Sequence, residues 1–292
     1  NSIASGGNYN TVVGDEAGTA LTTGDYNTSL GFEALKATTD RNSNVAVGAQ
    51  VLFTNVNGAK ATAVGTAALY TQNPATDVDT YNVAVGFEAG KLVTTGTNNT
   101  LVGALAGDAL TTSGFNTAVG SEALTSATTA TSNTAIGRSA LATNILSSQN
   151  TAVGLNALTT HNQATAVDSL NTAVGFAAGA AVTTGLKNVL VGALAGDSLT
   201  DVDFNVALGY NALTTDTLGS KSTAIGFQTL RDQNFTTATD TFNTAVGFNA
   251  GTNVTTGSQN TLIGGLAGDS LTDGGENVAV GYNTLSTEDG NG

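Results

Sequence analysis

The residues best suited to chemistry gather in three segments where the chain carries extra residues. These segments read TQNPATDVDTYN (71–82), THNQATAVDSLN (160–171) and RDQNFTTATDTFN (231–243). Carboxylates and aromatic rings on loops of a rigid scaffold suit the recognition of a surface partner. The alternative is a tolerated surface insertion, since lengthening a loop costs little. The candidate contacts with a cell-surface glycan or protein are Asp77, Asp79, Tyr81, His161, Asp168, Asp240 and Phe242.

Metal binding and catalysis have weaker signatures. The segments 77–79 and 201–203 both read Asp-Val-Asp and suggest calcium, but neither continues into an Asp-rich loop with a terminal Glu. His161 is the only histidine, and the sequence shows no nucleophile beside a base, no facing carboxylate pair and no phosphate-binding Gly-Lys-Ser or Gly-Lys-Thr segment. We therefore expect a protein that is not an enzyme, with no bound metal and no cofactor.

Composition narrows the class further. The chain has 292 residues with 37 Gly, one Pro, no Cys and only 10% charged residues, which is unusual for a globular enzyme. Its net charge of −14 disfavours nucleic acid and anionic membrane surfaces. No stretch approaches the roughly 20 apolar residues of a membrane span, and no signal peptide opens the chain. Because the chain starts at Asn1 and contains no Met, we expect it to be a processed product or one segment of a longer protein.

The segments that must position these residues are repeats of one short motif. Each copy of the motif begins a new coil, and most coils are seventeen residues long. Three coils are four residues longer, because they contain the insertions. The sixteen starts are Asn10, Asn27, Asn44, Ala61, Asn82, Asn99, Asn116, Asn133, Asn150, Asn171, Asn188, Asn205, Ser222, Asn243, Asn260 and Asn277.

Two columns of the repeat predict a backbone corner and a core. The fifth position is Gly in all sixteen coils, which predicts a corner where the backbone has positive φ or approaches another backbone closely. This column includes Gly86, Gly103, Gly120 and Gly137. The fourth position is always Val, Ile or Leu, and we expect it to face the core.

The first position predicts a ladder of side chains. It is Asn in fourteen of the sixteen coils, and stacked Asn side chains can hydrogen-bond from one coil to the next. Asn82, Asn99, Asn116 and Asn133 are four consecutive members of the predicted ladder.

A compensation between two columns supports stacked coils. The ninth position is Leu or Gly, and where it is Gly, as at Gly90, a Leu or Val such as Val93 follows three residues later. Where it is Leu, as at Leu158 and Leu213, the later position holds another residue type, here His161 and Asp216. One large apolar side chain per coil then fills the same volume by two routes, as close packing requires.

These features predict an all-β fold, a parallel β-solenoid or β-roll of about sixteen 17-residue coils. Glycine at this frequency disfavours helices by up to ~1 kcal/mol per residue. We expect one strand per coil at Asn-Thr-Ala-Val and a second near the segments EAL or LAG. The whole chain, residues 1–292 with repeats over 10–292, is expected to form one continuous domain.

The strand also predicts assembly with other chains. Its second and fourth residues face one side and its third faces the other, yet the third is usually Ala and becomes Leu at Leu101, Leu190 and Leu262. A solvent-facing column should be polar. We therefore expect sister chains to cover the third-position face in a parallel homotrimer.

The recurring NTAVGxxAL and NTAIGRSAL segments resemble phage and bacterial tail-fibre repeats, and are similar to the head repeats of trimeric autotransporter adhesins. The resemblance covers Asn10 to about Leu285 and implies a trimeric fibre that attaches to a host surface. It implies an extracellular place, on a virion or a bacterial cell surface, and other fibre or virion proteins as further partners. The adhesin repeat is usually shorter than the repeat of this chain, and no adhesin neck, stalk or membrane anchor is recognisable here. A bacterial adhesin and a polysaccharide-degrading tailspike are the alternatives.

Two further surface patterns stay open. Paired threonines such as 94–95, 183–184 and 255–256 could form an ice-binding array, although the columns are interrupted. Aromatic residues recur just after the Gly column and just before Asn, where they could stack on glycans or pack between coils or chains.

Overall fold

A computed structural model describes residues 6–286, which form two compact units, one within Asn1–Ser148 and the other within Gln149–Gly292. Each unit is a parallel β-solenoid whose coils have the length that the sequence predicts. No helix occurs among the described residues. The two units are described separately.

The first unit has one three-residue strand per coil and short two-residue strands beside an insertion. The three-residue strands pair in the order β1-β2-β3-β5-β7-β8-β9-β10, and β4 pairs with β6. Their bounds are β1 Thr11–Val13, β2 Thr28–Leu30, β3 Val45–Val47, β4 Gly58–Ala59, β5 Thr62–Val64, β6 Val78–Asp79, β7 Val83–Val85, β8 Thr100–Val102, β9 Thr117–Val119, β10 Thr134–Ile136 and β11 Ser147–Ser148.

The second unit repeats this plan. Its three-residue strands pair in the order β12-β14-β15-β16-β18-β20-β21-β22, and β17 pairs with β19. Their bounds are β12 Thr151–Val153, β13 Val167–Asp168, β14 Thr172–Val174, β15 Val189–Val191, β16 Val206–Leu208, β17 Gly219–Ser220, β18 Thr223–Ile225, β19 Thr239–Asp240, β20 Thr244–Val246, β21 Thr261–Ile263 and β22 Val278–Val280.

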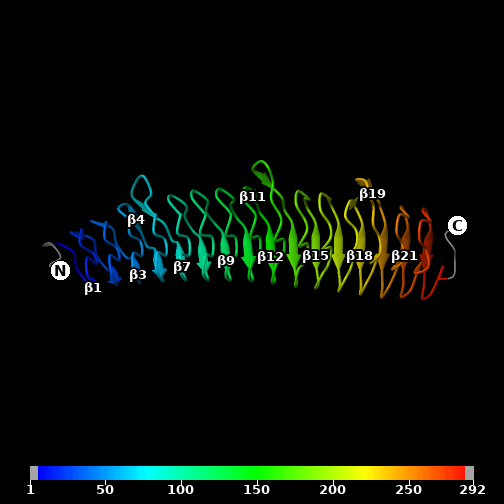
Figure 1. Ribbon diagram of the computed structural model, residues 1–292, viewed down its shortest axis with the longest axis horizontal. Helices are drawn as coiled ribbons and strands as arrows, with labels where there is room; N and C mark the ends of the chain where they lie inside the picture. The colour runs from blue at the N-terminus through cyan, green and yellow to red at the C-terminus, as the bar shows by residue number, and fades with distance from the viewer. Residues whose placement is uncertain (1–5, 287–292) are drawn as a thin grey trace. The chain divides into compact units, whose positions relative to one another are not determined.

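Within each unit the strands are parallel and in register. Figure 1 shows the arrows of successive coils side by side, in chain order. In the first unit Ala118 of β9 lies opposite Ala135 of β10, and in the second Ala173 of β14 lies opposite Leu190 of β15. Equivalent residues of successive coils therefore form columns, and a property of one column recurs about every 4.8 Å.

The glycine column forms the corner after each strand. Gly86, Gly103, Gly120 and Gly137 have φ of 143°, 137°, 136° and 132°. A Cβ at Gly103 would lie 2.5 Å from the carbonyl oxygen of Gly120, so the column needs Gly for two reasons, positive φ and close backbone approach.

The expectation of a second strand at EAL or LAG is wrong. Those segments are consecutive turns, in which the seventh and ninth residues of a coil both have positive φ. Glu88 at a seventh position and Leu124 at a ninth position each have a φ of 54°, and where the ninth residue is Gly it too has positive φ. A strand cannot form through two left-handed residues separated by one position. The coil closes by tight turns, and a short second strand forms where an inserted segment pairs with the coil before it, as β6 with β4 and β19 with β17.

The asparagine column forms a hydrogen-bonded ladder within each unit. The backbone N–H groups of Asn99, Asn116 and Asn133 donate to the Oδ1 atom of the preceding ladder asparagine at 2.9, 3.1 and 3.0 Å. Each Nδ2 also donates to a carbonyl fourteen residues later, as from Asn82 to Gly96 at 2.7 Å. Each buried amide thus satisfies backbone groups at the corner before its strand.

The two faces of each strand point in the opposite directions to those predicted from the sequence. The third position points inward: Ala118, Ala245 and Leu101 are fully buried within their own chain. The fourth position, expected in the core, points outward, and the exposed fractions of Ile136 and Leu208 are 38% and 45%. So short a coil encloses room for a methyl group beneath the strand, whereas a Val or Ile there would overfill it. The large β-branched residues therefore lie outside.

The predicted exchange between the ninth and twelfth positions is confirmed. Leu124 and Leu158 at the ninth position are fully buried, and in the glycine coils Val93 and Leu110 at the twelfth position are fully buried instead. A Cβ at Gly107 would lie 2.7 Å from the Cδ1 atom of Leu110, so the two routes exclude each other.

A third filler appears where two glycine coils follow one another. Leu101 replaces the usual Ala at the third position, and its methyl groups would lie 2.6 and 2.9 Å from Cβ atoms at Gly90 and Gly107. Leu190 and Leu262 occupy the corresponding place in the second unit and are fully buried. Leu101 therefore fills the volume that two successive glycines leave free, which maintains close packing.

Candidate functional site

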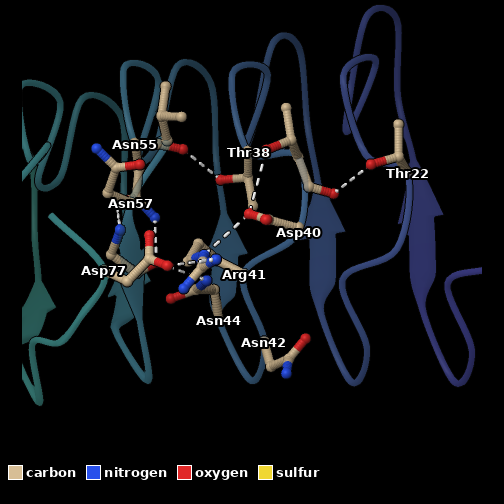
Figure 2. A network of polar contacts seen from close by, with 12 residues as sticks. Thr22, Thr38, Asp40, Arg41, Asn42, Asn44, Asn55, Asn57 and Asp77 are labelled. Atoms are coloured by element: carbon tan, nitrogen blue, oxygen red, sulfur yellow. Dashed lines mark hydrogen bonds and ion pairs between the residues drawn. The ribbon is translucent and has the colours of Figure 1, made fainter.

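The insertion of the first unit is held by an arginine two coils earlier in the chain. Figure 2 shows the Arg41 guanidinium between Asp40 and Asp77. The Arg41 Nη2 atom lies 3.0 Å from an Asp77 carboxylate oxygen, and Nε lies 2.9 Å from Asp40. The hydrogen bond from Arg41 lowers the pKa of Asp40. Asp77, a predicted contact residue, is exposed but already paired within the chain.

A lysine, a carboxylate and an aromatic ring meet where this insertion ends. Lys60 Nζ lies 2.6 Å from Asp79 Oδ2 and 5.3 Å from the centre of the Tyr81 ring. The Tyr81 hydroxyl also donates to Asp79 Oδ2 at 3.2 Å. The hydrogen bond from Lys60 lowers the pKa of Asp79. The structure thus brings together the predicted residues Asp79 and Tyr81 and adds Lys60, which was not predicted.

The insertion 231–242 of the second unit repeats this arrangement. Lys221 Nζ lies 2.5 Å from Asp240 Oδ2 and 5.2 Å from the centre of the Phe242 ring. Both predicted residues are exposed, and Lys221 again was not predicted. The signal that could have found it is its position, because Lys60 and Lys221 both directly precede the first residue of an inserted coil.

The insertion 160–170 keeps the carboxylate of this arrangement but has neither the lysine nor the aromatic ring. Asp168 is exposed, and Leu170 occupies the position of Tyr81 and Phe242. Gln149 occupies the position of the two lysines. The predicted contact Asp168 therefore has no lysine at the corresponding place to neutralise it.

His161 is not a surface contact. Its side chain is fully buried, and neither ring nitrogen makes a hydrogen bond. The physical reason is its place in the coil: it is the twelfth residue, the column that supplies the core with Val93 and Leu110 in the glycine coils. The alignment of columns was the signal for this burial.

Polar residues at the same column of the other inserted coils are also buried but are hydrogen-bonded. Gln72 Oε1 accepts a hydrogen bond from Asn82 Nδ2 at 2.9 Å, and Gln233 Oε1 accepts one from Asn243 Nδ2 at 2.8 Å. Gln233 Nε2 donates to Asp216 at 2.5 Å, and burial raises the pKa of the Asp216 carboxyl group. These residues tie each insertion to the next member of the asparagine ladder.

The outward columns form an uncharged strip along each unit. Positions two and four of the strands hold Thr, Val, Ile and Leu, and none of the 8 basic and 22 acidic residues of the chain. Aromatic residues border the strip just after the glycine column. In the second unit the rings of Tyr210, Phe227 and Phe248 stack on one another at 5.5 and 5.3 Å. Because these rings stack on one another, packing between coils accounts for these three residues better than glycan stacking.

The first threonine of two of the pairs considered for ice binding is hydrogen-bonded to the next coil. The Thr94 hydroxyl donates to the carbonyl of Thr111 at 3.2 Å, and the Thr255 hydroxyl donates to that of Thr272 at 3.0 Å. These hydroxyls join successive coils within a unit and are not free to order water. We therefore do not propose an ice-binding function.

Within residues 6–286, no group of three or more His, Asp or Glu side chains is placed to hold a metal ion, and no pocket is present. The same part of the chain has no helix that could cross a membrane. Comparison with protein-family models, curated proteins and solved structures finds no match.

Proposed function

We propose that this chain is the shaft of a trimeric attachment fibre, a phage tail or virion fibre, which contacts a host surface through its insertions. The observation that carries the proposal is the uncharged outward strip of apolar and threonine side chains, on a chain whose net charge is −14. Extended apolar patches on soluble proteins mark interaction surfaces.

Sister chains are the partner that fits this strip. It recurs with the period of the coils, and a second copy of the chain offers the same period along its whole length. Like-charge repulsion between two acidic chains is smallest where their charge-free strips meet. A closed parallel trimer gives every coil the same environment. The face that we propose to be covered is thus the second and fourth positions, and no longer the third.

Attachment is proposed from the insertions and from the resemblance of the NTAVGxxAL repeats to fibre proteins. Exposed Asp79, Tyr81, Asp168, Asp240 and Phe242 lie on segments that add four residues to a regular coil. Repetition of weak contacts along a fibre and around its axis would strengthen binding by multivalency. The adhesin repeat is usually shorter than the repeat of this chain, so we propose the phage fibre over a bacterial adhesin.

The assembly is tested by the mass of the protein in solution. We expect three copies for the wild type and one for Val102→Asp/Val119→Asp, which places carboxylates on the outward strip in neighbouring coils. Thr95→Asp, which adds a carboxylate at an exposed turn, is the matched control and should remain trimeric. A monomeric wild type, or a double variant that stays trimeric, would contradict the proposal.

Attachment is tested by shortening the three inserted coils to the length of the other coils. We expect this variant to assemble normally, because the repeat keeps its phase, and to lose binding to bacterial cells that retain the labelled wild type. Equal retention of both proteins across a panel of bacterial cells would reject the insertions as the contact region.

A further inference from the structure

The interior of the coil Asn150–Leu170 contains an unusual set of unpaired polar atoms. His161 is fully buried, and neither Nδ1 nor Nε2 makes a hydrogen bond. The Oγ atom of Ser169, in the same coil, is also buried without a partner. A neutral imidazole carries one donor and one acceptor, so both capacities of the ring are unmet.

In the two other inserted coils the twelfth residue is hydrogen-bonded, although the Nε2 atom of Gln72 is buried without a partner. Gln72 and Gln233 accept hydrogen bonds from the ladder residues that begin the next coils. Asn171, the corresponding ladder residue after His161, donates its Nδ2 to the carbonyl of Gly185 at 2.8 Å. Asn82 and Asn243 make the same bond, to Gly96 and Gly257, so the histidine coil lacks only the additional bond from the ladder amide to the twelfth residue.

The residue two positions before the ladder asparagine shows the same contrast. Thr80 donates its hydroxyl to the carbonyl of Ala59 at 3.1 Å, and Thr241 donates to that of Ser220 at 3.0 Å. Ser169 replaces these threonines and makes no such bond. At His161 and Ser169 the insertion 160–170 therefore lacks side-chain hydrogen bonds that the equivalent residues of its two counterparts make.

We infer that the insertion 160–170 is an acid-opened segment: protonation of His161 expels the ring from the coil and frees the insertion, while insertions 71–81 and 231–242 stay closed. A buried imidazolium would have two N–H donors and only the backbone of Thr183 to offset part of its charge, and burial of a charge without a counter-charge is strongly unfavourable. Opening the segment lets the ring reach water, so proton uptake and opening are coupled.

Within the second unit, the charged side chains of the histidine coil and of the coil that follows it are placed to stay in water and not to stabilise an imidazolium. Asp168 is the other titratable residue of the histidine coil and Lys187 is that of the following coil, and both are exposed. Burial lowers the pKa of His161 from 6.5 to about 4, and the backbone of Thr183 offsets this only in part.

The sign of the pH dependence follows from this lowered pKa. Between pH 6.5 and 4 the open segment binds a proton that the closed segment does not, so the closed form loses stability as the pH falls. The open-to-closed ratio should rise about tenfold per pH unit within that window. Between pH 7 and 4.5 the increase should be roughly fifty-fold.

The ring itself gives the first test, because His161 is the only histidine of the chain. In the full-length protein with isotope-labelled histidine, its NMR signal should stay that of a neutral, buried ring at pH 6.5 and change only well below it. A ring that titrates near pH 6.5 without any change in the insertion would overturn the inference.

Peptide-level hydrogen exchange gives the second test. After correction for the intrinsic pH dependence, exchange in 160–170 should increase between pH 7 and 4.5. The insertions 71–81 and 231–242 serve as internal controls and should show no increase, since the raised pKa of Asp216 means that proton uptake there favours the closed form of 231–242. His161→Gln, which copies Gln72 and Gln233, should abolish the increase. Equal acid sensitivity of the variant, or of all three insertions, would reject His161 as the cause.

Discussion

The inward and outward residues of each short strand are similarly apolar but differ in size and surroundings. Ala135 of β10 is fully buried, whereas the exposed fraction of its neighbour Ile136 is 38%. In most coils the smaller residue is inside and the larger one is outside, which is the reverse of ordinary expectation. Hydrophobicity alone therefore does not identify the core of so narrow a coil, because the enclosed volume decides which side chain fits.

The comparison also separates two stabilising tasks. The inward column packs within one chain, against the leucines of the ninth or twelfth position. The outward column has no such partners in its own coil and is available to other chains. Changes inside should act on folding of the single chain, and changes outside should act on the proposed assembly.

The largest difference is expected between Ala118→Asp and Val119→Asp, which place the same carboxylate on opposite sides of β9. Ala118→Asp buries an unpaired charge and should destabilise the fold by more than about 4 kcal/mol. Val119→Asp should cost the isolated chain about 1 kcal/mol or less, since its side chain reaches water. Circular dichroism and denaturant unfolding at low protein concentration measure both.

A β-sheet signal retained by Ala118→Asp and lost by Val119→Asp would invert the assignment of the two faces. The wild-type chain under the same denaturant conditions is the reference for each variant.

The second largest loss of stability is expected when a side chain that fills the interior of the coil is shortened. Leu101→Ala should destabilise the chain by about 2–5 kcal/mol, because Leu101 fills the space between Gly90 and Gly107. Denaturant unfolding measures the loss. The outward substitution Val102→Ala, one residue later in β8, is the matched control and should cost less.

A combined variant tests whether the fillers exchange. Leu101→Ala/Gly107→Leu/Leu110→Ala gives the coil the residues of its neighbour, which has Ala118, Leu124 and Ala127 at these positions. Leu124 adopts a φ of 54° and Gly107 one of 55°, so the new leucine fits the backbone. We expect the combined variant to recover at least half of the loss, and additive destabilisation would contradict the exchange.

Sequence predicted the features of this fold that depend only on neighbouring residues and coils. The glycine corner, the exchange between Leu124-type and Val93-type fillers and the asparagine contacts depend on one coil and its neighbour, so repetition alone reveals them. Alternation along a strand separates two faces but does not say which is inside. That choice depends on the cross-section of the coil, which the turns at Glu88 and Leu124 determine, and those turns were predicted as a strand.

The insertions show the same limit. Exposure of Asp79, Tyr81, Asp240 and Phe242 follows from their place in added segments, but their internal pairing with Lys60 and Lys221 depends on which columns adjoin at the corner. His161 was assigned to the surface from its local sequence, although the twelfth column, which includes the buried Val93 and Leu110, assigns it to the interior.

The smallest expected change in stability comes from an ion pair on the outside of the coils, where the three insertions can be compared. Gln149→Lys would give the insertion 160–170 the lysine that Lys60 and Lys221 provide to the others, with Asp168 as its carboxylate partner. An exposed ion pair contributes about 0.2–1 kcal/mol, so the gain in unfolding free energy should lie in that range and should shrink in high salt. Adding Leu170→Phe should increase the gain by about 0.5–1 kcal/mol through the cation–aromatic contact. If Gln149→Lys stabilises equally when Asp168 is replaced by Asn, the lysine acts by lowering the net negative charge and not by the pairing that the other two insertions show.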